Sequence, residues 1–170
     1  MMPIFEREVI LVPMKQLLVI VLISVFFFSC KQEQPDPYAL PDSYSNQSLG
    51  KSANDLLSDT KYTALNVQIQ YMPGYAPDSQ AVSNLSAFLN SVCNKPAGIM
   101  INMTEIPSSG DSITPLKAAL IEKKYRTAYT SGTTISVYVL ITDGYDTSVT
   151  TLGFAFRNTS VCLLGKDISD

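Results

Sequence analysis

One stretch of the chain decides its fold: residues 134–141, TISVYVLI. Apolar side chains stand at nearly every position of this stretch, whereas a strand with one face in water alternates apolar and polar residues. We therefore predict a central strand that is covered on both faces, which is typical of a mostly parallel sheet.

Two strand–helix units precede this strand. Leu, Val, Ile and Tyr alternate with polar residues over 65–71, which predicts a strand with one buried and one polar face. Asp78 and Thr114 are good N-caps for helices, and Pro115 favours the first turn of the second helix. Two such units in succession imply right-handed crossovers and three parallel strands. The expected elements are a strand at 65–71, a helix at 78–94, a strand at 99–106 and a helix at 114–124.

The last part of the chain departs from this alternation. Residues 152–157, LGFAFR, and residues 160–164, SVCLL, are separated only by Asn158 and Thr159. Such a short connection permits a hairpin, so at least one strand should run antiparallel to the first three. The predicted fold class is α/β: a mixed, mostly parallel sheet of about five strands with two helices, formed by one domain at 51–170.

The N-terminus resembles an export signal. Residues 17–28 are apolar except for Ser24, and Lys15 precedes them. This run is too short to span a bilayer as a helix, which needs about 20 residues, and it suits the core of a signal peptide. Ser29 and Cys30 follow directly, as at the cleavage site of a bacterial lipoprotein, whose cysteine carries lipid.

We therefore predict a lipoprotein signal peptide at 1–29, with Met14 as the initiator, and lipidation of Cys30. The alternative is an ordinary secretory signal with an incidental cysteine. Residues 30–50 are rich in Pro, Ser, Asn, Gln and Asp and show no apolar period, which predicts a disordered tether. The expected location is the bacterial cell envelope, where the lipid on Cys30 holds the exported domain to a membrane.

Histidine is absent from all 170 residues. Catalytic zinc is normally held by two or three imidazoles, and the usual serine and cysteine hydrolases need an imidazole as base. The net charge is −3 without clustered Lys or Arg, so no nucleic acid partner is expected. Residues 50–52, GKS, resemble the end of a phosphate-binding loop, but Ser45 stands where that pattern needs its first glycine, so no nucleotide is expected.

The order of the elements resembles the N-terminal subdomain of the zincin metallopeptidases, and of the metzincin branch in particular. Asp143 and residues 152–155, LGFA, resemble the segment before the active-site helix of archaemetzincin-like enzymes. Residues 71–75, YMPGY, and 156–160, FRNTS, resemble a bacterial lipoprotein family of membrane metalloproteases. The resemblance implies a zincin-like N-terminal subdomain over about 50–168.

The resemblance also implies that the next element would be a helix with H-E-x-x-H, in which two imidazoles bind zinc and the glutamate is the general base. The chain runs through residues 165–170, GKDISD, without this motif. No catalytic or metal-binding residue is therefore carried over. Zinc is expected as a cofactor only together with a histidine-bearing C-terminal half.

One role does carry over, because the antiparallel edge strand of zincins binds extended substrate by adding it to the sheet. That strand corresponds here to Leu152, Gly153, Phe154, Ala155, Phe156 and Arg157. The alternative is a plain edge strand without a ligand. A zincin half-domain without its active-site helix would also expose the sheet face that this helix covers.

Two functions of different classes remain open. The first is a truncated or degenerate lipid-anchored zinc metallopeptidase, which is inactive as it stands. The second is a non-enzymatic, lipid-anchored domain that binds peptide or protein at its sheet edge.

Two further groups of residues have a functional and a structural interpretation. Asp111, Asp143 and Asp146 could bind calcium, which prefers clustered carboxylates, although solvated turn residues explain them better. Cys93 and Cys162 could form a disulfide in an oxidising compartment. Their place on separate apolar elements favours two buried free thiols.

Overall fold

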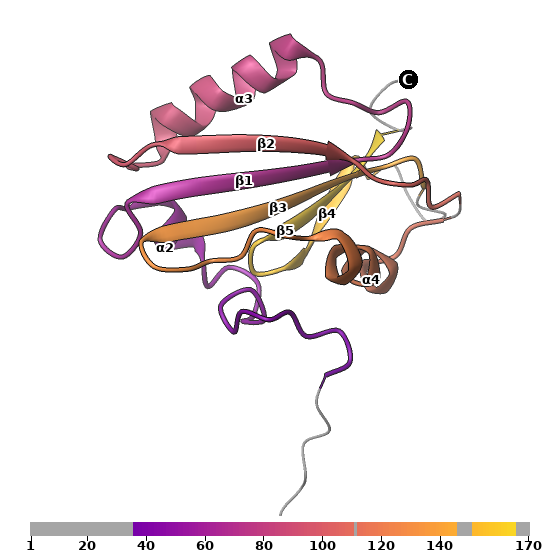
Figure 1. Cartoon of the computed structure of the whole chain (residues 1–170), viewed down its shortest axis with the longest axis horizontal. Helices are drawn as coiled ribbons and strands as arrows, with labels where there is room; N and C mark the ends of the chain where they lie inside the picture. The colour runs from indigo at the N-terminus through magenta and orange to yellow at the C-terminus, as the bar shows by residue number, and fades with distance from the viewer. Residues whose placement is uncertain (1–35, 111, 146–150, 166–170) are drawn as a thin grey trace, which may run out of the picture. The chain divides into compact units, whose positions relative to one another are not determined.

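The structure is a computed structural model that describes residues 36–110, 112–145 and 151–165. Five strands form one sheet in the order β2-β1-β3-β5-β4 (Figure 1). The strands are β1 (Ala64–Tyr71), β2 (Ile99–Glu105), β3 (Thr134–Thr142), β4 (Gly153–Arg157) and β5 (Ser160–Leu164). The helices are α2 (Ala53–Leu57), α3 (Ser79–Val92) and α4 (Pro115–Tyr125).

The predicted fold class is confirmed, since the sheet is mixed, mostly parallel and five-stranded. β3 is its central strand, and β4 alone is antiparallel to its neighbour, β5. Four strands are parallel rather than the three predicted, because β5 pairs with β3 in the parallel direction. The sequence also gave no signal for α2, whose five residues are too few to show a helical period.

The two longer helices begin where their caps predict. The Asp78 side chain accepts a hydrogen bond from the Ala81 amide (2.6 Å), and the Thr114 side chain accepts one from the Lys117 amide (3.2 Å). α3 connects β1 to β2, which is the neighbour of β1 on one side, and α4 connects β2 to β3, which is the neighbour of β1 on the other side. Crossovers of one hand therefore place α3 and α4 on opposite faces of the sheet.

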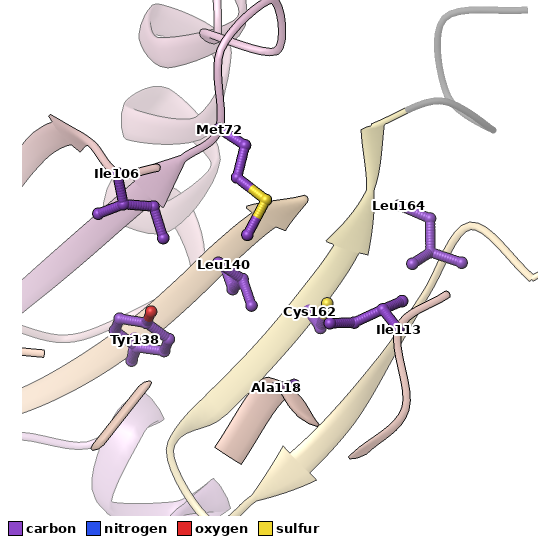
Figure 2. Packing of buried hydrophobic residues seen from close by; sticks show 8 residues of the cluster. All are labelled: Met72, Ile106, Ile113, Ala118, Tyr138, Leu140, Cys162 and Leu164. Atoms are coloured by element: carbon purple, nitrogen blue, oxygen red, sulfur yellow. The ribbon is translucent and has the colours of Figure 1, made fainter. Parts of the chain in front are cut away.

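The face under α4 holds the more deeply buried of two apolar clusters. Figure 2 shows its members: Met72, Ile106, Ile113, Ala118, Tyr138, Leu140, Cys162 and Leu164. The side of β1 that was expected to be polar and exposed also lies on this face, and it is buried. The Gln70 carboxamide accepts a hydrogen bond from Tyr138 Oη (2.7 Å), and the Gln68 carboxamide accepts one from the Ala128 amide (2.9 Å). Both glutamines are buried because the chain itself supplies these partners.

The face under α3 is covered less completely. Leu65, Val67 and Ile135 are buried there, and Leu85 and Leu89 of α3 pack against them. None of the described side chains of α3 is fully buried, and every second residue of β3 from 137 to 141 is only half-buried. The prediction that β3 is covered on both faces is therefore correct for the α4 side and only partly correct for the α3 side, where Ile135 is buried.

Residues 36–50 differ from the predicted disordered tether. Tyr44 and Ser45 are buried, and this segment lies against the turn between β4 and β5. Asn158 Nδ2 donates to the Tyr44 carbonyl (3.0 Å), and the hydroxyls of Ser45 and Thr159 are 2.9 Å apart. The segment is ordered despite its polar composition because it supplies partners for the polar groups of that turn.

Candidate functional site

The predicted edge strand is β4, which is the outermost strand beside β5. Leu152 lies just before it, and Gly153 pairs with Leu163 in the register of the ladder. The Leu164 amide donates to the Leu152 carbonyl (2.9 Å), so these two residues form a hydrogen-bonded pair. Because such pairs alternate along an antiparallel ladder, the backbone groups of Gly153 and Ala155 point away from β5. No strand of the described residues pairs with the other side of β4, which therefore presents the N–H and C=O groups of two residues.

The side chains of β4 differ between its two faces. Phe154 and Phe156 pack against the cluster under α4, with their ring centroids 6.3 Å apart. Ala155 is exposed on the α3 side, where Gly153 has no side chain at all. A peptide that approached this edge would meet small residues on the α3 side and aromatic rings on the other.

A cavity of about 460 Å³ lies on the α3 side, near the carboxyl ends of β1, β3 and β5. Val139, Ile141 and Leu163 line it from the sheet, and Leu85 lines it from α3. The ring of Tyr75 also lines it and packs on Gly165, where a Cβ atom would lie 2.3 Å from Tyr75 Cδ1. The walls are mostly apolar, so the cavity suits an apolar group rather than an ion.

The apolar surface continues from this cavity along α3. Phe88 and Val92 follow Ala81 by seven and eleven residues, so these side chains lie on one flank of the helix. Phe88 is 61 % exposed and Val92 is 42 % exposed. The α3 flank and the half-buried side chains of β3 and β5 thus form an apolar surface that the described residues leave uncovered.

A buried charge cluster fixes the end of β4. Arg157 Nε lies 2.9 Å from Glu122 Oε2, and Arg126 Nη1 donates to Glu122 Oε1 (2.7 Å). Ser160 Oγ donates to the same carboxylate (2.5 Å). The side chains of Glu122, which lies in α4, and of Arg126, the C-cap residue of α4, are fully buried. This cluster was not predicted from the sequence, although the spacing of four between Glu122 and Arg126 is a signal for a helical ion pair.

Of the three aspartates that could bind calcium, only Asp143 lies within the described residues, and its role there is structural. Asp143 accepts hydrogen bonds from Ser108 and Ser109 and so ties the loop after β2 to the end of β3. Burial by itself would raise the pKa of Asp143, but these hydrogen bonds outweigh it and hold that pKa below its usual value. Asp111 and Asp146 lie outside the described residues. Within the described ranges, no group of His, Cys, Asp or Glu side chains is arranged to hold a metal ion.

The two described cysteines are free thiols. Cys162 is fully buried under α4, and burial raises the pKa of its thiol to about 12. Cys93 is half-buried and belongs to the apolar cluster on the opposite face of the sheet. The sheet separates the two thiols, which explains why they are not paired. Cys30, the predicted lipidation site, lies outside the described residues.

Comparison with family models, with curated proteins and with solved structures found no match to this chain. No helix within the described ranges is long and apolar enough to cross a membrane.

Proposed function

We propose that residues 51–170 form the peptide-binding subdomain of a zincin-like lipoprotein, and that β4 binds an extended peptide by adding it to the sheet. The observation that carries this proposal is the outer side of β4, where no strand among the described residues pairs with the backbone groups of Gly153 and Ala155. The resemblance to metzincins assigns substrate binding to the same strand. The 170 residues contain no H-E-x-x-H, so the proposed activity of this chain alone is binding without hydrolysis.

Backbone pairing alone would give weak binding. Four hydrogen bonds at Gly153 and Ala155 contribute about 2 to 6 kcal/mol in total. The loss of translational and rotational freedom on association costs about 4 kcal/mol or more. A measurable affinity therefore requires side-chain contacts as well.

The α3 side of β4 can supply those contacts. A peptide residue opposite Gly153 would point its side chain over the glycine towards Leu163, which also lines the apolar cavity. A residue two positions further along the peptide would lie beside the exposed Ala155. Burial of one large apolar side chain contributes about 1.5 to 3 kcal/mol, so apolar residues at alternate positions should dominate selection.

The uncovered apolar surface on the α3 side supports the zincin-like interpretation of the fold. The resemblance implies that a helix carrying the zinc ligands packs on this side of the sheet. That helix would pack on the half-buried side chains of Val139, Ile141 and Leu163. It would also contact the flank of α3 that includes Leu85 and Phe88. Parallel sheets are normally covered on both faces, so an apolar face that is half open calls for a further layer.

The alternative function is a non-enzymatic domain that binds peptide or protein at the same edge. It is favoured by the absence of histidine from the 170 residues. The two functions make the same prediction for peptide binding at β4. They differ in whether a histidine-bearing segment restores hydrolysis.

The test is an assay of zinc content and peptide cleavage on the purified 170-residue chain. We expect no stoichiometric zinc and no cleavage above background, because the chain has no imidazole to hold a catalytic metal. Chelator-sensitive cleavage, with co-purifying proteases excluded, would contradict the proposal. Activity that appears only when an H-E-x-x-H segment is added would support the enzyme rather than the binding domain. The coding DNA after Asp170 shows directly whether such a segment exists.

We also propose that lipid on Cys30 anchors the protein to a membrane of the bacterial envelope. The support is the apolar run at 17–28 followed by Ser29 and Cys30. Cys30→Ala should prevent acylation, which mass spectrometry of the N-terminal peptide detects. A wild-type protein that is soluble on fractionation and carries no acyl mass would refute the anchor.

A further inference from the structure

The outer surface of α4 combines apolar and basic residues. Leu116, Leu120 and Lys123 are spaced by four and three residues, so they form one stripe along the helix. The leucines are 52 % and 49 % exposed, and Lys124 beside them is exposed too. Glu122 is the acidic residue of this helix, and it points inward to the buried arginines. The exposed side of α4 therefore carries leucines and positive charge without a negative charge of its own.

The beginning of the described chain is fixed beside this helix. Lys123 Nζ donates to the Pro37 carbonyl, and an Arg157 guanidinium nitrogen donates to the Tyr38 carbonyl. Leu120 lies about one helical turn from Lys123, and Leu116 lies about 10 Å along the axis from it. Figure 1 shows α4 and the indigo segment after residue 36 on the side of the sheet away from α3.

The chain between the proposed lipidation site and the first described residue, Asp36, is short. Five residues, 31–35, separate Cys30 from Asp36. A chain rises at most about 3.6 Å per residue, so the two Cα atoms are no more than about 22 Å apart, whatever path the chain takes. An acylated Cys30 would thus hold the α4 side of the domain close to the lipid headgroups.

We propose that the exposed face of α4, formed by Leu116, Leu120, Lys123 and Lys124, lies on the surface of an anionic membrane. Leucines enter the boundary between headgroups and acyl chains, and lysines contact anionic headgroups, as in other interfacial helices. The inference rests on the proposed lipid anchor and is independent of peptide binding at β4. The face of the domain that carries α4 would then lie on the membrane, and α3 would point away from it.

The absence of tryptophan from the chain gives a direct test. Single-tryptophan variants Leu120→Trp and Phe88→Trp of the full acylated protein would be placed in vesicles of brominated phosphatidylethanolamine and phosphatidylglycerol. Phe88 is the matched control because it is an exposed apolar residue of a helix on the opposite face. Bromolipids should quench Leu120→Trp at least about twofold more than Phe88→Trp, because only the former reaches the acyl boundary.

A second arm tests the lysines. In the Leu120→Trp protein, Lys124→Gln should shift the balance between docked and undocked orientations about fivefold towards undocked in anionic vesicles. Quenching should be unchanged by Lys124→Gln when phosphatidylcholine replaces phosphatidylglycerol. Equal quenching of the two tryptophans, or quenching of Phe88→Trp alone, would overturn the inference.

The outcomes separate this inference from its premise. An acyl mass on Cys30 with no quenching of Leu120→Trp would refute the membrane face and leave the anchor intact. A protein without an acyl group would refute both the lipid anchor and the membrane-bound face of α4. Association of the acylated protein into dimers that protect Leu120→Trp from bromolipid would show that a second copy, rather than lipid, covers α4.

Discussion

Leu163 leans over Gly153: its Cδ2 atom lies 3.0 Å from the position that a Cβ atom on Gly153 would occupy, and the carbonyl oxygen of Cys162 lies 2.4 Å from it. No side chain fits at residue 153 while β4 keeps its distance from β5. The same glycine leaves the side chain of Leu163 open to a strand that adds to the edge. Close strand pairing and access from the edge thus depend on one residue.

Gly153→Ala should displace β4 from β5, because the added methyl group meets a backbone oxygen that cannot rotate away. Overpacking of this kind costs about 1 to 3 kcal/mol in the free energy of unfolding. Urea denaturation of Gly153→Ala beside Ala155→Ser, an exposed position on the same face, measures the difference. Equal midpoints for the two variants would show that β4 is not held as described.

Leu163→Ala should change peptide selectivity more than it changes binding as such. The capped heptapeptide KLTLTLK should lose about tenfold in affinity, which corresponds to about 1.4 kcal/mol, whereas KTTTTTK should be nearly unaffected. Met100→Ala is the control, since Met100 is 60 % exposed and lies on β2, at the opposite edge of the sheet. Titration calorimetry with both peptides gives the ratio, and an unchanged ratio would exclude Leu163 as a selectivity residue.

Glu122→Gln should be strongly destabilising, because it leaves the guanidinium groups of Arg126 and Arg157 buried without a carboxylate. Removal of one partner of a buried ion pair costs about 3 to 5 kcal/mol in the free energy of unfolding. Lys61→Gln removes an exposed cation near Asp55 and should be far less destabilising, because solvent screens such a pair. If the two variants unfold at the same denaturant concentration, the cluster contributes nothing to stability.

Asp143 should make stability depend on pH in the acid range. Hydrogen bonds from Ser108 and Ser109 hold the pKa of Asp143 below the unfolded value of about 3.9. The stabilisation is therefore present above that value and lost as pH falls through the folded pKa. The advantage of the wild type over Asp143→Asn should shrink below about pH 4 and amount to about 1 kcal/mol or less, because the carboxylate is partly exposed. An advantage that is constant from pH 2 to pH 6 would contradict this.

Local signals in the sequence were enough to predict most of the fold. Asp78, Thr114 and Pro115 act through groups within the first turn of each helix, so the sequence alone locates the starts of α3 and α4. The apolar run of β3 and the short turn at Asn158 predicted a central strand and a hairpin for the same reason. These features depend on neighbouring residues and not on the rest of the molecule.

Features that depend on distant partners were not predicted. Gln68 and Gln70 looked like an exposed face of β1, but Tyr138 and the residues after α4 supply partners that allow their burial. Residues 36–50 looked disordered because the turn at Asn158 that orders them lies more than 100 positions away. Polar composition signals exposure only where the chain offers no partner.

The edge strand was located correctly, but the properties that make it a candidate site depend on tertiary structure. The direction of the backbone groups of Gly153 and Ala155 follows from the register with β5. The contact between Leu163 and Gly153 follows from the distance between the two strands. Neither can be derived from a sequence pattern.

The most direct test of strand addition at β4 is amide hydrogen exchange, followed by NMR, with and without the heptapeptide KLTLTLK. The amides of Gly153 and Ala155 should exchange about tenfold more slowly at a peptide concentration ten times Kd, because they gain partners. The amide of Phe154, which faces β5, is the internal control and should change little. A peptide N-methylated at the residues that face β4 should give no protection. Unchanged exchange at Gly153 and Ala155 while the peptide is bound, or equal protection by the N-methylated peptide, would contradict binding at this edge.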